Sequence, residues 1–152
     1  MKKIMWCFII CSLLVTGCSL EKAKVAMSTH TSEVLNGVEG ELRDVIVDYF
    51  DNFDDVYGYK EYVTENFLKQ VYRDCTDDNS DTKTLDQMAE ALHQINLKSV
   101  HLLRYDIIDL KSDEDQVKLH VHRDFSHNSS NNITYIMIKE NGIWKFDKIL
   151  RF

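Results

Sequence analysis

The fold class is decided by residues 133–152, which read ITYIMIKENGIWKFDKILRF. Two runs rich in β-branched and aromatic residues flank Asn141-Gly142, and this pair is the strongest short signal for a two-residue β-hairpin turn. The segment therefore predicts strands over 133–140 and 143–152. Trp144 and Phe146 are two residues apart on the second strand, so they share one face, which we expect to be buried.

The preceding segment has the same two-residue period. Residues 100–110 and 116–125 alternate apolar and polar side chains, and the connections 111–115 and 126–132 are short enough to join antiparallel neighbours. Together with the C-terminal hairpin they predict a meander of four strands.

Helical spacing replaces this alternation upstream of residue 99. Apolar residues recur every three or four positions over 34–53, which predicts a long helix whose strongest part is 40–54. Thr64 is a good N-cap for a second helix, and residues 84–96 predict a third. Helices followed by a meander predict an α+β domain, with N-terminal helices packed on one face of a curved four-stranded antiparallel sheet.

The N-terminus predicts export. Lys2 and Lys3 precede a short apolar run, and small residues then lead to Cys18. Val15-Thr16-Gly17-Cys18 resembles the bacterial lipobox. That resemblance implies cleavage after Gly17, a diacylglyceryl thioether on Cys18, and an extracytoplasmic protein anchored to the cell membrane or the outer membrane of a bacterium. The expected organisation is a signal peptide over 1–17, a lipidated tether over 18–32 and one domain over 33–152.

The charge balance argues against one class of partner. The whole chain has a formal net charge of −7, and residues 1–17 contain two lysines and no acidic residue. The remaining chain is thus more acidic still, whereas nucleic-acid binding needs clustered basic residues. We expect no nucleic-acid partner and a membrane contact made by the lipid on Cys18.

Two short motifs carry a family resemblance. Residues 140–147 (ENGIWKFD) are similar to the final hairpin, and residues 64–67 (TENF) to the second-helix entry, of nuclear-transport-factor-2-like and cystatin-like domains. The resemblance implies helices that fill the concave side of the sheet. Such domains occur in bacterial lipoproteins, including ones encoded on conjugative elements, and they serve as isomerases, dehydratases, ligand binders and interaction modules.

His120, His122 and Asp124 form the first candidate site. They alternate with apolar residues on the strand over 116–125, so we expect them on the outward face as solvated or interface residues. A metal site would need a third ligand such as His101 or His127. We expect neither a metal nor a cofactor.

The second candidate site is the interior of the domain. An enzyme of the resembled folds would use a carboxylate or histidine beside a tyrosine, and Tyr49, His101 and Tyr105 are the residues available for that role. The sequence contains no identifiable acid–base pair, so we lean against an enzyme.

Two functions therefore remain. The leading hypothesis is a non-enzymatic, lipid-anchored envelope protein that binds another protein or itself, by resemblance in an accessory or exclusion role for a conjugation or secretion machine. Ile136 and Ile138, on the outward face, suggest either a docking surface or cover by long polar neighbours. The alternative is a small-molecule binder or an isomerase- or dehydratase-like enzyme that uses the interior.

Overall fold

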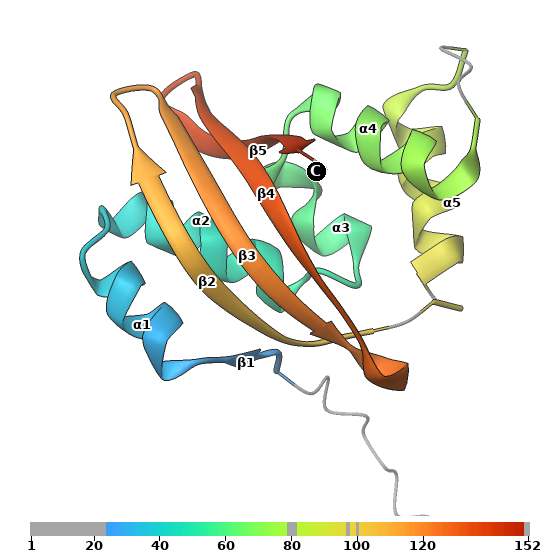
Figure 1. The fold of residues 1–152 in the computed structure, drawn as a ribbon. Coiled ribbons are helices and arrows are strands. Elements are labelled where there is room, and N and C mark those ends of the chain that lie inside the picture. Colours follow the sequence, from blue (N-terminus) through green and yellow to red (C-terminus); the bar gives the residue numbers. More distant parts are fainter. Residues whose placement is uncertain (1–23, 79–81, 97, 100, 151–152) are drawn as a thin grey trace, which may run out of the picture.

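The computed structural model describes residues 24–78, 82–96, 98–99 and 101–150; the predicted signal peptide and Cys18 lie outside this part of the chain. The described helices are α1 (Thr29–Asn36), α2 (Gly40–Asp51), α3 (Val56–Tyr59), α4 (Glu65–Thr76) and α5 (Leu85–Asn96), with 3₁₀ turns at Lys60–Tyr62 and Ser126–Asn128. The strands are β1 (Ala26–Met27), β2 (Leu102–Ser112), β3 (Gln116–Phe125), β4 (Ser129–Glu140) and β5 (Ile143–Leu150). The domain is α+β, as predicted (Figure 1).

The predicted hairpin is confirmed. Glu140 pairs with Ile143, and the two residues between them have positive φ angles of 55° at Asn141 and 83° at Gly142. Asn and Gly tolerate this conformation better than other residues, which explains why the turn occurs here. Trp144 and Phe146 are both buried, so the predicted core face of β5 is also confirmed.

The sheet has five strands and is mixed, which corrects the prediction of a four-stranded antiparallel sheet. Strands β2 to β5 form the expected antiparallel meander, but β1 adds to the edge of β2 in parallel, with Ala26 opposite Arg104 and Met27 opposite Tyr105. Two residues cannot display a two-residue period, so this strand left no pattern in the sequence.

The single long apolar stripe over 34–53 belongs to two helices. Helix α1 ends at Gly37, whose N–H reaches the carbonyls of Val34 and Leu35, and α2 begins at Gly40. Strand β1 and the start of α1 also show that packed structure begins within the stretch expected to be tether. The buried side chain of Thr31 lies in that stretch.

Helices cover one side of the sheet. Helices α2 and α3 lie behind it in the view of Figure 1, α4 and α5 lie beyond β5, and α1 lies along β2. The core between these layers is strongly aromatic. The Tyr49 and Phe146 rings stack at 4.0 Å between centroids, and those of Phe50 and Tyr105 at 4.2 Å.

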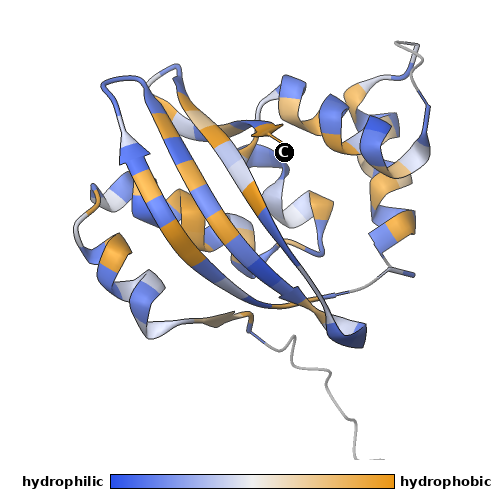
Figure 2. Cartoon of the chain, viewed as in Figure 1, coloured by the Kyte–Doolittle hydropathy of each residue, from blue (hydrophilic) through white to orange (hydrophobic). Residues whose placement is uncertain are grey.

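Among the described residues, no helix lies over the opposite side of β3 and β4 (Figures 1 and 2). We call it the outer face. Its side chains alternate with core residues along the two strands, as the hydropathy colours in Figure 2 show. They are Lys118, His120, His122, Asp124, Asn132, Thr134, Ile136 and Ile138.

Helix side chains form hydrogen bonds with the backbone of both outer strands of the meander, β2 and β5. At the β5 edge, the Gln70 amide donates to the carbonyl of Ile149 at 2.7 Å and accepts from its N–H at 2.8 Å. At the β2 edge, the Ile107 N–H donates to the Thr31 hydroxyl at 2.6 Å. These bonds occupy backbone groups that would otherwise be available to a strand of another chain.

Candidate functional site

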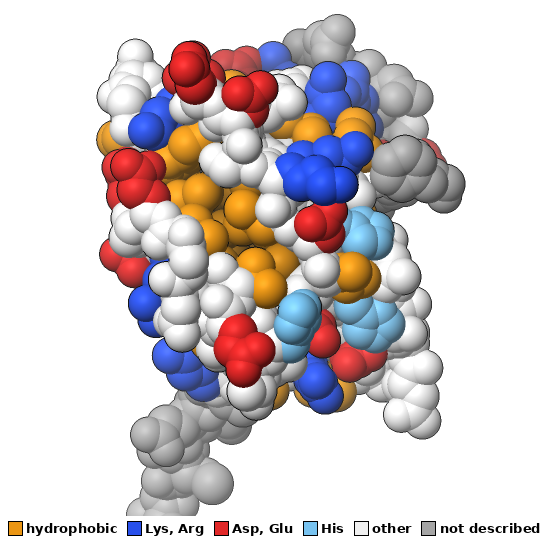
Figure 3. All heavy atoms as spheres, turned by 60° about the vertical axis from the view of Figure 1, so that its left-hand side comes forward, with side chains coloured by type: hydrophobic (Ala, Val, Ile, Leu, Met, Phe, Trp, Pro, Cys, Tyr) orange, Lys and Arg blue, Asp and Glu red, His pale blue; other side chains and the backbone are white. Residues whose placement is uncertain are grey.

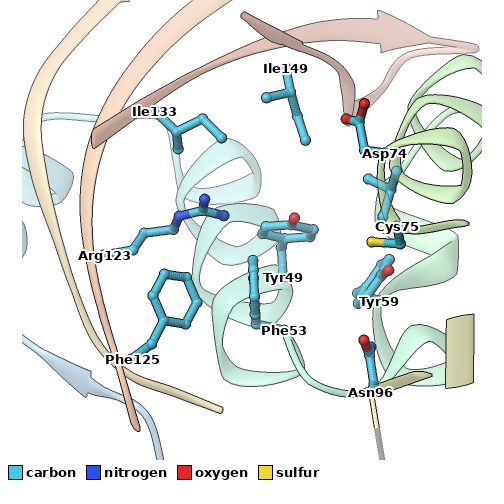
Figure 4. A pocket seen from close by; sticks show the side chains of 11 residues that line it. Tyr49, Phe53, Tyr59, Asp74, Cys75, Asn96, Arg123, Phe125, Ile133 and Ile149 are labelled. Carbon is cyan, nitrogen blue, oxygen red and sulfur yellow. The ribbon is translucent and has the colours of Figure 1, made fainter. Parts of the chain in front are cut away.

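The principal candidate site is a cavity of about 200 Å³ between the sheet and the helices (Figure 4). Side chains from α2, α3, α4, α5 and three strands converge on it. We call it the Arg123 cavity, and its lining is Tyr49, Phe53, Tyr59, Val71, Asp74, Cys75, Asn96, Arg123, Phe125, Ile133 and Ile149.

Arg123 supplies the positive charge of this cavity. It occupies a core-facing position of β3, after Val117, Leu119 and Val121, and it is only 7% exposed. Its Nε donates to the Asn131 side chain at 3.0 Å, and its Nη1 donates to the Tyr135 hydroxyl at 2.7 Å. The guanidinium therefore has a fixed orientation, and Figure 4 shows it pointing into the cavity.

Aromatic rings enclose the guanidinium. Its central carbon lies 5.3 Å from the Phe53 ring centroid, 5.2 Å from that of Phe125 and 5.8 Å from that of Tyr135. Within the part of the chain that the structure describes, no carboxylate forms an ion pair with Arg123 and no group accepts a hydrogen bond from Nη2.

The tyrosines around the cavity are held in the neutral form. Burial raises the pKa of Tyr49 well above its usual value, the nearby Tyr135 and Tyr59 raise it further, and Arg123 opposes the shift. Burial likewise raises the pKa values of Tyr59 and Tyr135. These phenols can donate hydrogen bonds, but none is suited to remove a proton near neutral pH.

The cavity is open on the α4 side. Asp74 and Cys75 line it from the end of α4, and both residues are exposed. In Figure 4 they lie across the cavity from Arg123. The site thus has a cationic, aromatic inner end and an outer end that carries a carboxylate and a thiol.

The three interior candidates from the sequence are not gathered in this cavity. Tyr49 lines it, whereas the Tyr105 ring packs on Phe50 and its hydroxyl lies 3.3 Å from the sulfur of Met27. His101 precedes β2 with a side chain that is 57% exposed, and its Nδ1 lies 3.3 Å from a carboxylate oxygen of Asp54. Tyr49 alone contributes to the site.

Arg123 was not among the candidate residues predicted from sequence. The signal was nevertheless present, because alternation along β3 places residues 117, 119, 121 and 123 on one face, and the first three are apolar. A charged residue that continues a buried stripe marks either a paired charge or a binding site.

His120, His122 and Asp124 lie on the outer face, as predicted. The Nδ1 of His120 lies 2.8 Å from the Thr134 hydroxyl, and that of His122 lies 2.6 Å from the Asn132 amide oxygen. The other ring nitrogen of His122 lies 3.0 Å from Asp124.

These contacts favour the charged form of His122. The hydrogen bond to Asn132 is the main cause of a raised pKa for this imidazole, desolvation opposes it, and Asp124 adds to it. In the described residues no group of three His, Cys, Asp or Glu side chains is arranged to hold a metal ion.

Exposed hydrophobic residues also occur on β2, the strand that pairs with β3. Leu103 and Ile108, at the two irregularities of the β2–β3 register, are 55% and 44% exposed. Met27 of β1 is 39% exposed and lies opposite Tyr105, on the helix side of the sheet. Figure 3 shows hydrophobic side chains gathered in a hollow on one side of the molecule, with histidine and acidic side chains next to it. Ile136 and Ile138, by contrast, are half-buried, since Lys118, Lys145 and Lys148 stand opposite them.

The comparisons with known proteins show a fold and no family. No family model matches the chain, and no curated protein matches it. Its structure is similar to the solution structure of RPA3114, a SEC-C motif containing protein from Rhodopseudomonas palustris, with a TM-score of 0.50 and 10% identity over 81% of this chain and 89% of that one. At this identity the likeness concerns the fold alone.

Proposed function

We propose that this protein is a lipid-anchored component of the bacterial cell envelope, whose α+β domain binds another protein and does not act as an enzyme. The anchor rests on residues 1–18, with their basic start, short apolar run and cysteine preceded by small residues. In the described part of the chain, no helix has the length and apolar character needed to cross a membrane.

The binding role is supported most by the side of the sheet that the helices leave open. The polar row His120, His122 and Asp124 lies there, and Leu103 and Ile108 are exposed at the register irregularities of β2, the strand that pairs with this row. An apolar area with a polar rim is typical of protein interfaces. The hydrogen bonds of the two histidines fix the rim before a partner arrives, which lowers the entropy lost on binding.

The enzyme alternative has less support. It needs a proton acceptor at the buried inner end of the cavity, but the tyrosines there have raised pKa values and Arg123 is the one buried charge among the described residues. The Asp74 carboxylate lines the exposed outer end. His101 is on the surface. An acid–base mechanism of the isomerase or dehydratase kind would lack its base at the inner end of the cavity.

We also propose that the domain belongs to the nuclear-transport-factor-2-like or cystatin-like folds. The layer order and the cavity between helices and sheet support this assignment. The resemblance to lipoproteins of conjugative elements favours a component of a conjugation or secretion machine as the partner.

The experiment is capture of the membrane-anchored protein after cross-linking in cells, comparing wild type with the double variant His120→Lys, His122→Lys. Both side chains lie outside the core, so the variant should fold, although each change removes a hydrogen bond worth about 1 kcal/mol. It should lose the captured partner, because two longer, permanently charged side chains replace the imidazoles at the contact.

The matched control is Gln94→Lys, Ser99→Lys, which introduces two lysines at exposed positions near the end of α5. It should capture the partner as wild type does. Capture that survives the histidine change, or fails equally with both variants, would argue against the open side of the sheet as the binding surface.

A further inference from the structure

We propose that the Arg123 cavity binds a small monocarboxylate with a single-ring or short branched apolar body. The site lies on the helix side of the sheet, away from the outer face, so this inference goes beyond the proposed protein-binding role. It rests on one buried charge and on the shape of the space in front of it.

The buried guanidinium of Arg123 has no counter-charge among the described residues. An arginine side chain stays ionised in proteins, and burying an unpaired charge is costly. Arg123 is 7% exposed, and its described partners are an amide, a phenol and three aromatic rings, none of which is an anion. A bound carboxylate would supply the missing counter-charge.

The guanidinium of Arg123 is also held in one orientation. Two of the five guanidinium N–H groups are engaged, by Asn131 and Tyr135, and the bonds to them hold the plane of the group fixed. Nη2 has no protein acceptor among the described residues. The guanidinium is therefore pre-oriented to donate to a carboxylate, and a planar fork is well matched to that group.

The size of the space limits the ligand. A cavity of about 150 Å³ lined by apolar side chains accepts a benzene molecule, and the Arg123 cavity has about 200 Å³. This is below the range of drug-sized ligand pockets. Apart from the polar groups already named, the walls are apolar or aromatic, and they include Phe53, Phe125, Ile133 and Ile149 (Figure 4).

The walls of the cavity limit the number of charges that a ligand can carry. Among the described residues Arg123 is the buried cation, and the side chains around it are mainly apolar or aromatic. A second carboxylate on the ligand would be buried without a counter-charge, which is costly. The site should thus prefer one carboxylate to two.

The test uses the full chain in mild detergent, with labelled isoleucine methyl groups observed by NMR. Benzoate is the probe, and benzamide, which has the same shape without the charge, is its control. Ile133 and Ile149 line the cavity, while the exposed Ile108 and Ile143 report on the surface. We expect saturable shifts at the first pair, no shift at the second, and binding of benzamide weaker by roughly 10- to 100-fold.

One variant completes the test. Arg123→Gln should lose benzoate binding while its other methyl signals keep their dispersion. Equal affinity for benzoate and benzamide, absence of saturable binding, or unchanged binding by Arg123→Gln would each overturn the proposal. The ligand comparison on the wild-type chain remains decisive if Arg123→Gln does not fold, and none of these measurements depends on partner capture.

Discussion

Phe146 of β5 packs directly against a helix residue and a residue of the neighbouring strand. Its ring is fully buried, stacks on Tyr49 of α2 at 4.0 Å and meets Tyr135 of β4 edge-on at 5.3 Å. Phe146→Ala should lower the free energy of unfolding by about 3–5 kcal/mol, because it removes buried area and leaves a cavity in an aromatic cluster. Urea unfolding measures this loss.

The matched control on the same strand is Ile143→Ala. That side chain is 51% exposed next to the turn, so its truncation should cost about 0.5 kcal/mol or less. A cost for Phe146→Ala no larger than that of the control would contradict the burial of this face of β5.

His122 provides a prediction about pH. Its hydrogen bonds to Asn132 and Asp124 raise the pKa of the imidazole above the usual 6.5. The native state then holds a proton that the unfolded chain has released, so the stabilisation is complete below about pH 6.5 and is lost as pH rises through the native pKa. The titration midpoint of His122, followed by NMR, should be above 6.5.

Asn132→Ala should lower that midpoint, because it removes the largest cause of the shift. Ser130→Ala is the control: it is on the same strand, but it faces Asp124 in the register and has no contact with His122. A midpoint that does not respond to Asn132→Ala would mean that this hydrogen bond is absent in solution.

At the scale of elements, the hydrogen bonds of helix side chains to the outer strands of the meander explain why α1 belongs to the packed structure. The Thr31 side chain is fully buried and accepts the N–H of Ile107, next to an irregularity in the β2–β3 register at Ile107/Asp109. Thr31→Val keeps the shape but removes the acceptor. It should cost about 1–3 kcal/mol in chemical unfolding, because a buried N–H is left without a partner.

Thr29→Val makes the same chemical change two residues earlier on α1, at an exposed position. It should have little effect on stability. Similar, small costs for both variants would show that α1 contributes nothing to the domain and acts as part of the tether.

The elements that could be predicted are those whose own residues form a local sequence pattern. The Asn141-Gly142 turn, the alternation of β3 and β4, and Thr64, whose side chain accepts the Phe67 N–H at 3.2 Å, each carry a local physical cause. Strand β1 and the contacts of Thr31 depend on residues about 75 positions away, which no local pattern reveals. The break at Gly37 was not predicted, because the apolar spacing over 34–53 continues across it.

Likewise, candidate site residues could be placed from the sequence only where a local pattern fixed their orientation. His120 and His122 could be assigned to the outer face because β3 alternates regularly. Tyr49, His101 and Tyr105 were grouped by residue type, and the fold separates them because Tyr105 packs on Phe50 and His101 precedes β2 on the surface. The role of Arg123 could not be predicted from β3 alone, because side chains from helices distant in the sequence form the rest of the cavity.

At the scale of the whole molecule, the two sides of the sheet offer different chemistry. The helix side encloses one fixed guanidinium in an aromatic cavity, and the other side presents half-exposed histidines. In the proposed function, the location of the protein would depend on Cys18 and not on the domain.

Cys18→Ser tests that dependence. The variant lacks the sulfur needed for the thioether, so it should be lost from washed membranes or accumulate with its signal uncleaved, while Cys75→Ser should remain membrane-bound as wild type does. Fractionation with a carbonate wash measures the first result, and mass spectrometry of the wild-type N-terminus measures the acyl groups. An uncleaved Cys18→Ser protein that stays in the membrane would mean that its apolar segment anchors it, and would leave the lipid assignment intact. Wild-type protein without any acyl modification would overturn the assignment, and with it the proposed place of this domain at the envelope.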